Sequence, residues 1–121
     1  MKSKYTCIAI DDDALFLEIF EFIAQQADSL ELKETYTTWN EGIVGLKKFQ
    51  PDILFLDVEL PDLNIVDLTK ELMSKPRIIM ISAHVRYDIT KLNFKVAKFV
   101  SKPIRDSQHL EAIAEEVMEI Q

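Results

Sequence analysis

Glycine and cysteine are both scarce in this chain. Its 121 residues include two glycines, Gly42 and Gly45, and both fall within one predicted helix. The chain therefore lacks a Gly/Ser-rich linker, and we predict a single domain over residues 1–121. The single cysteine, Cys7, has no partner for an internal disulfide. Its apolar neighbours favour a packing role in a buried strand over a reactive thiol.

Long apolar runs and an excess of positive charge are also missing. No stretch reaches the roughly 18 apolar residues of a membrane-spanning helix, and the N-terminus lacks the features of a signal peptide. We therefore predict a cytoplasmic protein. The net charge is −7, with a pI near 4.8. Because nucleic acid and anionic lipid repel such a domain, we predict that it binds neither directly.

Short apolar runs alternate with amphipathic stretches along the whole chain. The runs are typical of buried strands, since 48% of the residues are hydrophobic and the third run is apolar at every position. The predicted strands are Tyr5–Ile10, Leu30–Thr37, Ile53–Leu56, Ile78–Ile81 and Lys98–Val100.

Each predicted strand is followed by a segment with helical character. In the first, helical spacing places Leu15, Ile19, Phe22 and Ile23 together on one apolar face. The others are a helix capped by Asn40 that ends near Pro51, helices over Asn64–Ser74 and Tyr87–Asn93, and a last helix capped by Asp106 or Ser107 with Leu110, Ile113, Ala114 and Val117 inward.

This fivefold alternation predicts an α/β fold. Strands that are apolar on both faces belong to a parallel sheet covered by helices on each side. We therefore expect a doubly wound, flavodoxin-like fold with a five-stranded parallel sheet. In such folds, ligands bind outside the carboxyl ends of the strands, near the point where the strand order reverses.

Polar and charged residues follow four of the five predicted strands. The first strand runs into Asp11, Asp12 and Asp13, the third into Asp57, the fourth into Ser82 and the fifth into Ser101-Lys102-Pro103. Charged groups beside buried strands are costly unless they are paired or bound to a cation. We therefore expect these side chains to form one site.

Phosphoryl transfer to a carboxylate is a reaction that these groups could share. Asp57 would be the nucleophile, and Asp11, Asp12 and Asp57 form a suitable oxygen ligand set for Mg²⁺. Lys102 is expected to pair with Asp57 before the reaction and with a phosphoryl oxygen afterwards. The Ser82 hydroxyl could donate a hydrogen bond to another oxygen of the same group.

The same segments resemble a known family over essentially the whole chain. Five motifs occur in the order found in the receiver domains of two-component response regulators (CheY-like). They are Ile10-Asp11-Asp12-Asp13, Phe55-Leu56-Asp57, Leu60-Pro61, Ile81-Ser82-Ala83-His84 and Lys102-Pro103.

The resemblance implies a role for each site residue. Asp57 would accept a phosphoryl group from a sensor histidine kinase or phosphotransfer protein, in a reaction that requires Mg²⁺. The implied metal ligands are Asp12, Asp11 (through water), Asp57 and the backbone carbonyl of Val58. The implied switch residues are Ser82 and Phe99, and Lys102 would precede a cis bond to Pro103. The domain would be regulatory, with no enzymatic activity beyond phosphorylating and dephosphorylating itself.

Partners are also implied by the resemblance. Receivers of this kind usually meet partners, or pair as homodimers, through the fourth helix, fifth strand and fifth helix. Residues 51–57, 60–63 and 99–104 are similar to receivers of LytTR-type regulators, which carry a C-terminal DNA-binding output domain. The chain ends where its last helix should end, so we expect no output domain within it.

Two residues depart from the family pattern, and two other functions are alternatives to the receiver interpretation. Ile65 and Lys95 stand where many members have glycine, which puts the loop geometry in doubt. A receiver-like interaction module that is not phosphorylated is one alternative. A phosphohydrolase of the haloacid-dehalogenase type is the other, although Glu59 stands where that family needs aspartate. By itself, Asp11-Asp12-Asp13 is equally typical of a helix N-terminus.

Overall fold

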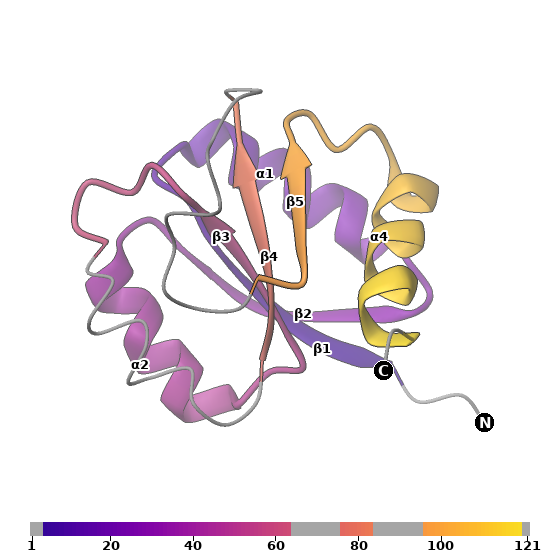
Figure 1. The fold of residues 1–121 in the computed structure, drawn as a ribbon, viewed down its shortest axis with the longest axis horizontal. Coiled ribbons are helices and arrows are strands. Elements are labelled where there is room, and N and C mark those ends of the chain that lie inside the picture. The colour runs from indigo at the N-terminus through magenta and orange to yellow at the C-terminus, as the bar shows by residue number, and fades with distance from the viewer. Residues whose placement is uncertain (1–3, 64–75, 84–95, 120–121) are drawn as a thin grey trace.

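A computed structural model describes residues 4–63, 76–83 and 96–119 of the chain. Within these residues, strands and helices alternate as far as the third strand, and a helix follows the fifth strand (Figure 1). The predicted helices over residues 64–74 and 87–93, together with Ile65 and Lys95, lie outside the described ranges. The strands are β1 (Tyr5–Ile10), β2 (Leu30–Tyr36), β3 (Ile53–Asp57), β4 (Arg77–Ser82) and β5 (Lys98–Ser101), and the helices are α1 (Ala14–Gln25), α2 (Trp39–Phe49) and α4 (Ser107–Glu119).

The five strands form one parallel sheet in the order β2-β1-β3-β4-β5, which confirms the predicted fold class. The chain leaves β1 for β2 on one side and then crosses back to β3 on the other (Figure 1). The order thus reverses at β1 and β3, and the carboxyl ends of these two strands border the crevice where doubly wound folds bind ligands.

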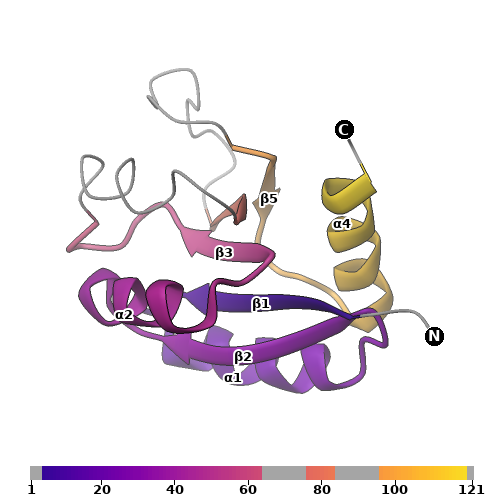
Figure 2. The ribbon, with the colours of Figure 1, turned by 90° about the horizontal axis from the view of Figure 1, so that it is seen from below.

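Helices cover both faces of the sheet because alternate residues of each strand point to opposite sides. In β1, Cys7 and Ala9 face the core under α1 and α4, whereas Ile8 and Ile10 face the core under α2. Figure 2 shows α2 and α4 on opposite sides of the sheet. Burial, followed by the charges of Asp52 and Glu31, raises the pKa of Cys7 to about 12. Cys7 is therefore a packing residue.

The predicted apolar face of α1 is not the face that packs against the sheet. Leu15, Ile19 and Phe22 are 64%, 51% and 64% exposed. The buried residues are Leu17, Phe20, Ile23 and Ala24, so Ile23 alone belongs to both sets. The helix is apolar around most of its circumference. Leu17, Phe20 and Ala24 lie on a second apolar stripe, and this stripe packs against the sheet.

The predicted cap of α2 is also wrong. The helix begins at Trp39, and its N-cap is Thr38, whose hydroxyl accepts a hydrogen bond from the Glu41 N–H at 3.2 Å. Asn40 is already the second helical residue. Its N–H and that of Trp39 donate to the carboxylate of Asp62, at 3.0 and 2.8 Å. A residue 22 positions away in sequence from Asn40 thus completes the cap.

Both glycines of the chain bring α2 close to the sheet. A Cβ at Gly42 would collide with the side chain of Ile10 on β1, and one at Gly45 would collide with the ring of Tyr36 on β2. The absence of a side chain at these positions therefore lets the helix approach the strands. At the other end of α2, the chain turns through Gln50 in the left-handed conformation, with φ 44°.

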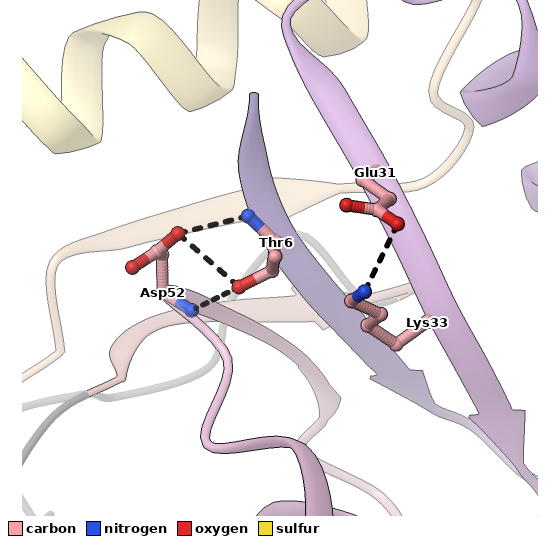
Figure 3. A network of polar contacts seen from close by, with 4 residues as sticks. All are labelled: Thr6, Glu31, Lys33 and Asp52. Carbon is pink, nitrogen blue, oxygen red and sulfur yellow. Dashed lines mark hydrogen bonds and ion pairs between the residues drawn. The ribbon is translucent and has the colours of Figure 1, made fainter. Parts of the chain in front are cut away.

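The amino end of the sheet is held by reciprocal hydrogen bonds between β1 and the residue before β3 (Figure 3). The backbone N–H and the hydroxyl of Thr6 both donate to the carboxylate of Asp52, at 2.9 and 3.2 Å. An exposed ion pair joins Lys33 to Glu31 on β2 at 2.9 Å. This network lies at the end of the strands opposite the charged edge predicted from sequence, so it is structural.

The last helix follows the prediction closely. Leu110, Ile113, Ala114 and Val117 are all buried. Asp106 caps the helix, because its carboxylate accepts from the His109 N–H at 2.8 Å. In the described part of the chain, no helix is long and apolar enough to cross a membrane.

Candidate functional site

Three carboxylates meet at the carboxyl ends of β1 and β3. Asp11 and Asp12 follow β1 directly, and Asp57 is the last residue of β3. One oxygen from each lies within 4.8 Å of the others. Asp11 and Asp57 are buried, whereas Asp12 is exposed. The structure therefore brings together the three side chains that the sequence analysis proposed as metal ligands.

The carboxylate of Asp11 is held from two sides. Its Oδ1 accepts a hydrogen bond from the Asp13 N–H at 2.8 Å. Its Oδ2 is buried and has no hydrogen-bond partner among the described residues, but the Lys102 ammonium lies 2.8 Å away as an ion pair. A buried carboxylate oxygen compensated only by a nearby charge is well suited to bind a cation.

The pKa of Asp57 is strongly perturbed. Burial raises its pKa to about 7, and the charge of Asp11 and a hydrogen bond with Asp12 act in the same direction. The Glu59 N–H, which donates to Asp57 Oδ1 at 2.9 Å, and the charge of Lys102 lower it in part. Without a bound cation, the protein therefore favours the protonated acid far more than water does.

Lys102 differs from the sequence-based expectation. It is paired with Asp11, whereas the sequence analysis expected a pair with Asp57. Its ammonium also lies over the ring of Phe16, 4.4 Å from the ring centre. The side chain is 16% exposed, so its charge is largely shielded from water. The bond from Lys102 to Pro103 is cis, as the family resemblance implied.

The remaining predicted residues lie on the neighbouring strands. Ser82 ends β4 and is fully buried, and the Lys102 N–H donates to its carbonyl at 2.8 Å. The N–H of Val58 donates to the carbonyl of Ile81 at 3.2 Å, which continues the sheet past β3. Phe99 on β5 is partly buried against the core under α2. The roles assigned to Ser82, Phe99 and the Val58 carbonyl remain predictions.

Other residues at this edge have structural tasks. Asp13 is the N-cap of α1, and its carboxylate accepts from the N–H groups of Leu15 and Phe16 at 3.1 and 3.2 Å. The sequence analysis missed the contact of Phe16 with Lys102 and the capping of α2 by Asp62. No pattern in the sequence indicates either, because both join segments that are distant along the chain.

The residues fit a magnesium ion. Mg²⁺ prefers a few carboxylate oxygens, with water completing an octahedral shell. The cluster supplies three carboxylates, one of them exposed enough to leave room for water. It includes no histidine or cysteine, the ligands typical of zinc sites. The repulsion between Asp11 and Asp57 would also fall when a cation binds.

Comparison with known proteins defines the class. Residues 7–114 match the family model of the response regulator receiver domain. The chain therefore belongs to the receiver-domain family of two-component response regulators. Receiver domains are regulatory.

The curated relatives include proteins named as an enzyme, as a transcriptional regulatory protein and as a sensory transduction protein. A protein-glutamate methylesterase/protein-glutamine glutaminase from Methanococcus maripaludis is 31% identical over 107 residues, which are 84% of this chain and 29% of the relative. The transcriptional regulatory protein BtsR of Escherichia coli is 25% identical, over 84% of this chain and 43% of BtsR. The sensory transduction protein LytT of Bacillus anthracis is 21% identical, over 88% and 44%. The chain thus spans less than half the length of these relatives.

Solved structures show the same fold. The signal receiver domain of the putative response regulator NarL from Mycobacterium tuberculosis superposes with a TM-score of 0.81 at 21% identity, and covers 98% of this chain and 99% of that one. A CheY-like receiver domain from Methanospirillum hungatei gives a TM-score of 0.78 at 23% identity, with coverage of 97% and 96%. At these identities, the likeness supports the fold alone.

Proposed function

We propose that Asp57 accepts a phosphoryl group from a sensor histidine kinase or phosphotransfer protein, in a reaction that depends on Mg²⁺. The observation that carries this proposal is the convergence of Asp11, Asp12 and Asp57 within 4.8 Å beside Lys102. Asp57 is the acid whose pKa is raised to about 7, and it lies close to the other two acids and the lysine. The unphosphorylated interaction module is the alternative that the experiment below separates.

The reaction forms a bond between one carboxylate oxygen of Asp57 and phosphorus, while the bond from phosphorus to the donor breaks and the donor leaves with that electron pair. A bound Mg²⁺ would neutralise charge on the transferring group and keep Asp57 ionised. The residues that would hold it are Asp11, Asp12, Asp57 and the carbonyl of Val58. Two negative reactants would otherwise repel each other.

Lys102 and Ser82 would stabilise the phosphorylated state. Both end or follow strands on the β4 side of β3, so they belong to the same edge of the sheet as Asp57. The ammonium of Lys102 would pair with one phosphoryl oxygen, and the Ser82 hydroxyl would donate to another. This arrangement would supply a positive charge and a donor where the new negative charge develops.

Output would follow from movement of Ser82 toward the phosphoryl group, with Phe99 turning into the space that it leaves. The surface that includes β5 and α4 would then change, and there the domain would pair with itself or a partner. We propose residues 1–121 as one domain that acts in the cytoplasm without binding nucleic acid directly. A DNA-binding output domain, as in LytTR-type regulators, would lie outside residues 1–121.

The test is phosphorylation by acetyl phosphate and Mg²⁺, followed by mass spectrometry of the intact protein. One phosphoryl group should be added to the wild type, none to Asp57→Asn, and one to the matched control Asp28→Asn, which changes an exposed acid. Chelation of the metal should stop the reaction. Equal labelling of the wild type and Asp57→Asn would refute the acceptor, and no labelling of either would favour the interaction module.

A further inference from the structure

The ammonium of Lys102 contacts two groups that both attract it. The first is Oδ2 of Asp11, at 2.8 Å. The second is the ring of Phe16, whose centre is 4.4 Å away, within the distance of a cation–π interaction. Lys102 thus has a defined resting position on Asp11, and an aromatic ring from α1 helps to form it.

Local structure fixes the ring of Phe16 in this place. The carboxylate of Asp13 starts α1 and accepts the N–H of Phe16, while the Asp13 N–H donates to Asp11. The rings of Phe16, Phe20 and Phe55 form a file that leads into the core, with centres 6.0 and 5.0 Å apart. Phe20 and Phe55 are fully buried, so they leave the Phe16 ring little freedom.

The resting position of Lys102 conflicts with a metal on Asp11. The oxygen that Lys102 neutralises is the buried Oδ2 of the same carboxylate that belongs to the three-acid cluster. A cation bound to that oxygen would repel the ammonium, because two positive charges at such short distances in a buried site interact strongly. Lys102 and the cation therefore compete for Asp11.

We infer that Phe16 is a positioning residue that holds Lys102 on Asp11, so that a divalent cation entering the site must displace the ammonium and thereby frees it for Asp57. This inference rests on the proposed Mg²⁺ site and deepens it, because it makes metal binding the event that makes Lys102 available.

The first test measures Mg²⁺ affinity by calorimetry at fixed pH and ionic strength. Phe16→Leu keeps an apolar side chain but removes the aromatic face, so Mg²⁺ should bind about two- to fivefold more tightly, the equivalent of a cation–π attraction at a partly exposed site. Phe16→Tyr should restore the wild-type affinity. The control Phe22→Leu makes the same change at an exposed position of the same helix and should change nothing.

A double-mutant cycle shows whether the effect passes through Lys102. In a Lys102→Met background, Phe16→Leu should leave the Mg²⁺ affinity unchanged, because the competing charge is gone. An equal gain in both backgrounds would overturn the inference, since Phe16 would then act on the acids directly. No gain in the wild-type background would overturn it as well.

Nuclear magnetic resonance provides a second measurement. The ring current of Phe16 should shift the ε-methylene protons of Lys102 upfield, and this shift should disappear when Mg²⁺ is added or when Phe16 is changed to leucine. A shift that Mg²⁺ leaves unaltered would contradict displacement. If acetyl phosphate still labels Asp57 in that case, the proposed function stands and only the role of Phe16 fails. If Lys102 moves but Asp57 is never labelled, the proposed function fails instead.

Discussion

At the scale of single residues, the site combines groups that destabilise one another in the absence of a cation. Asp57 is 3% exposed and lies beside a second buried acid, Asp11. Burial and the neighbouring charge favour the protonated form of Asp57, yet a phosphoryl acceptor has to be ionised. If Asp57 accepts a phosphoryl group as proposed, its chemistry would depend on a cation, and its burial has a cost in stability when no cation is bound.

That cost predicts how stability depends on pH in the metal-free protein. The pKa of Asp57 is about 7 in the folded state and close to the ordinary aspartate value in the unfolded state. The folded chain therefore binds the extra proton, and this contribution is present at low pH and is lost as pH rises toward and through 7. Urea unfolding in a chelator should show Asp57→Asn gaining stability over the wild type between pH 5 and pH 8. A constant difference across that range would contradict the burial of a titrating Asp57.

Asp12 and Asp13 are adjacent acids with different predicted effects. Asp12→Ala should weaken Mg²⁺ binding measured by calorimetry, because it removes a ligand oxygen of the cluster. Asp13→Ala should weaken it less, and should instead lower the free energy of unfolding by about 0.5–2 kcal/mol through loss of the α1 cap. Similar losses of Mg²⁺ affinity in both variants would show that the two acids do not divide these tasks.

At the scale of helices and strands, the sequence predicts strands better than helix faces and caps. The buried strands are apolar on both faces, so no choice of side arises, and their observed bounds lie within a residue of the prediction. In α1, two apolar stripes compete, and only packing against the sheet decides between them. The cap of α2 depends on Asp62, whose approach to Trp39 and Asn40 is a tertiary contact.

The pKa of Asp62 reflects how strongly these N–H groups stabilise its carboxylate. Desolvation would raise its pKa, but the N–H groups of Trp39 and Asn40 outweigh this effect and lower it. The loop after Asp57 is thus held at both ends, to Asp57 through the Glu59 N–H and to α2 through Asp62. A structural change at Asp57 would therefore act on a loop that is hydrogen-bonded to α2 through Asp62.

Because α1 packs through a different face from the one predicted, substitutions of two of its phenylalanines should differ in their effect on stability. Phe20→Ala should destabilise the fold by about 3–5 kcal/mol, because Phe20 is fully buried and packs edge-on against Phe55. Phe22→Ala should change stability by no more than about 0.5 kcal/mol, since Phe22 is exposed. Denaturant unfolding of both variants would test this. A larger loss of stability for Phe22→Ala than for Phe20→Ala would indicate that the face predicted from sequence is the one that packs against the sheet.

At the scale of the whole molecule, the candidate site could be predicted because parallel strands end at a common edge. That rule predicts one site from the polar residues that end or follow the strands, and in the folded chain these residues lie at the carboxyl ends of β1, β3, β4 and β5: Asp11, Asp57, Ser82 and Lys102. Which of these side chains pair with one another could not be predicted from the sequence. Lys102 pairs with Asp11 and also lies over the ring of Phe16, and both contacts are tertiary ones that the order of the strands does not determine.

The last prediction concerns how a signal would leave the site. Phosphorylation adds roughly −1.5 to −2 charges at Asp57, and Ser82 and Lys102 are the residues at the ends of β4 and β5 that could respond. A small bias of this kind shifts a protein between existing conformations instead of creating a new one. We therefore expect acetyl phosphate and Mg²⁺ to promote dimerisation or partner docking through the face that includes β5 and α4.

Ser82→Ala tests that route because it removes the hydroxyl and leaves Asp57 in place. The variant should still be phosphorylated, as measured by mass spectrometry, but the shift in sedimentation or in partner binding should be lost. Ser101→Ala is the matched control, since Ser101 pairs with Ser82 in the sheet register but is exposed at the end of β5. On phosphorylation, NMR shift changes in the wild type should spread from Asp57 to residues 87–100. Changes confined to the loop after Asp57 would exclude this route, because the new charge would then be answered without any movement of Ser82 or Phe99.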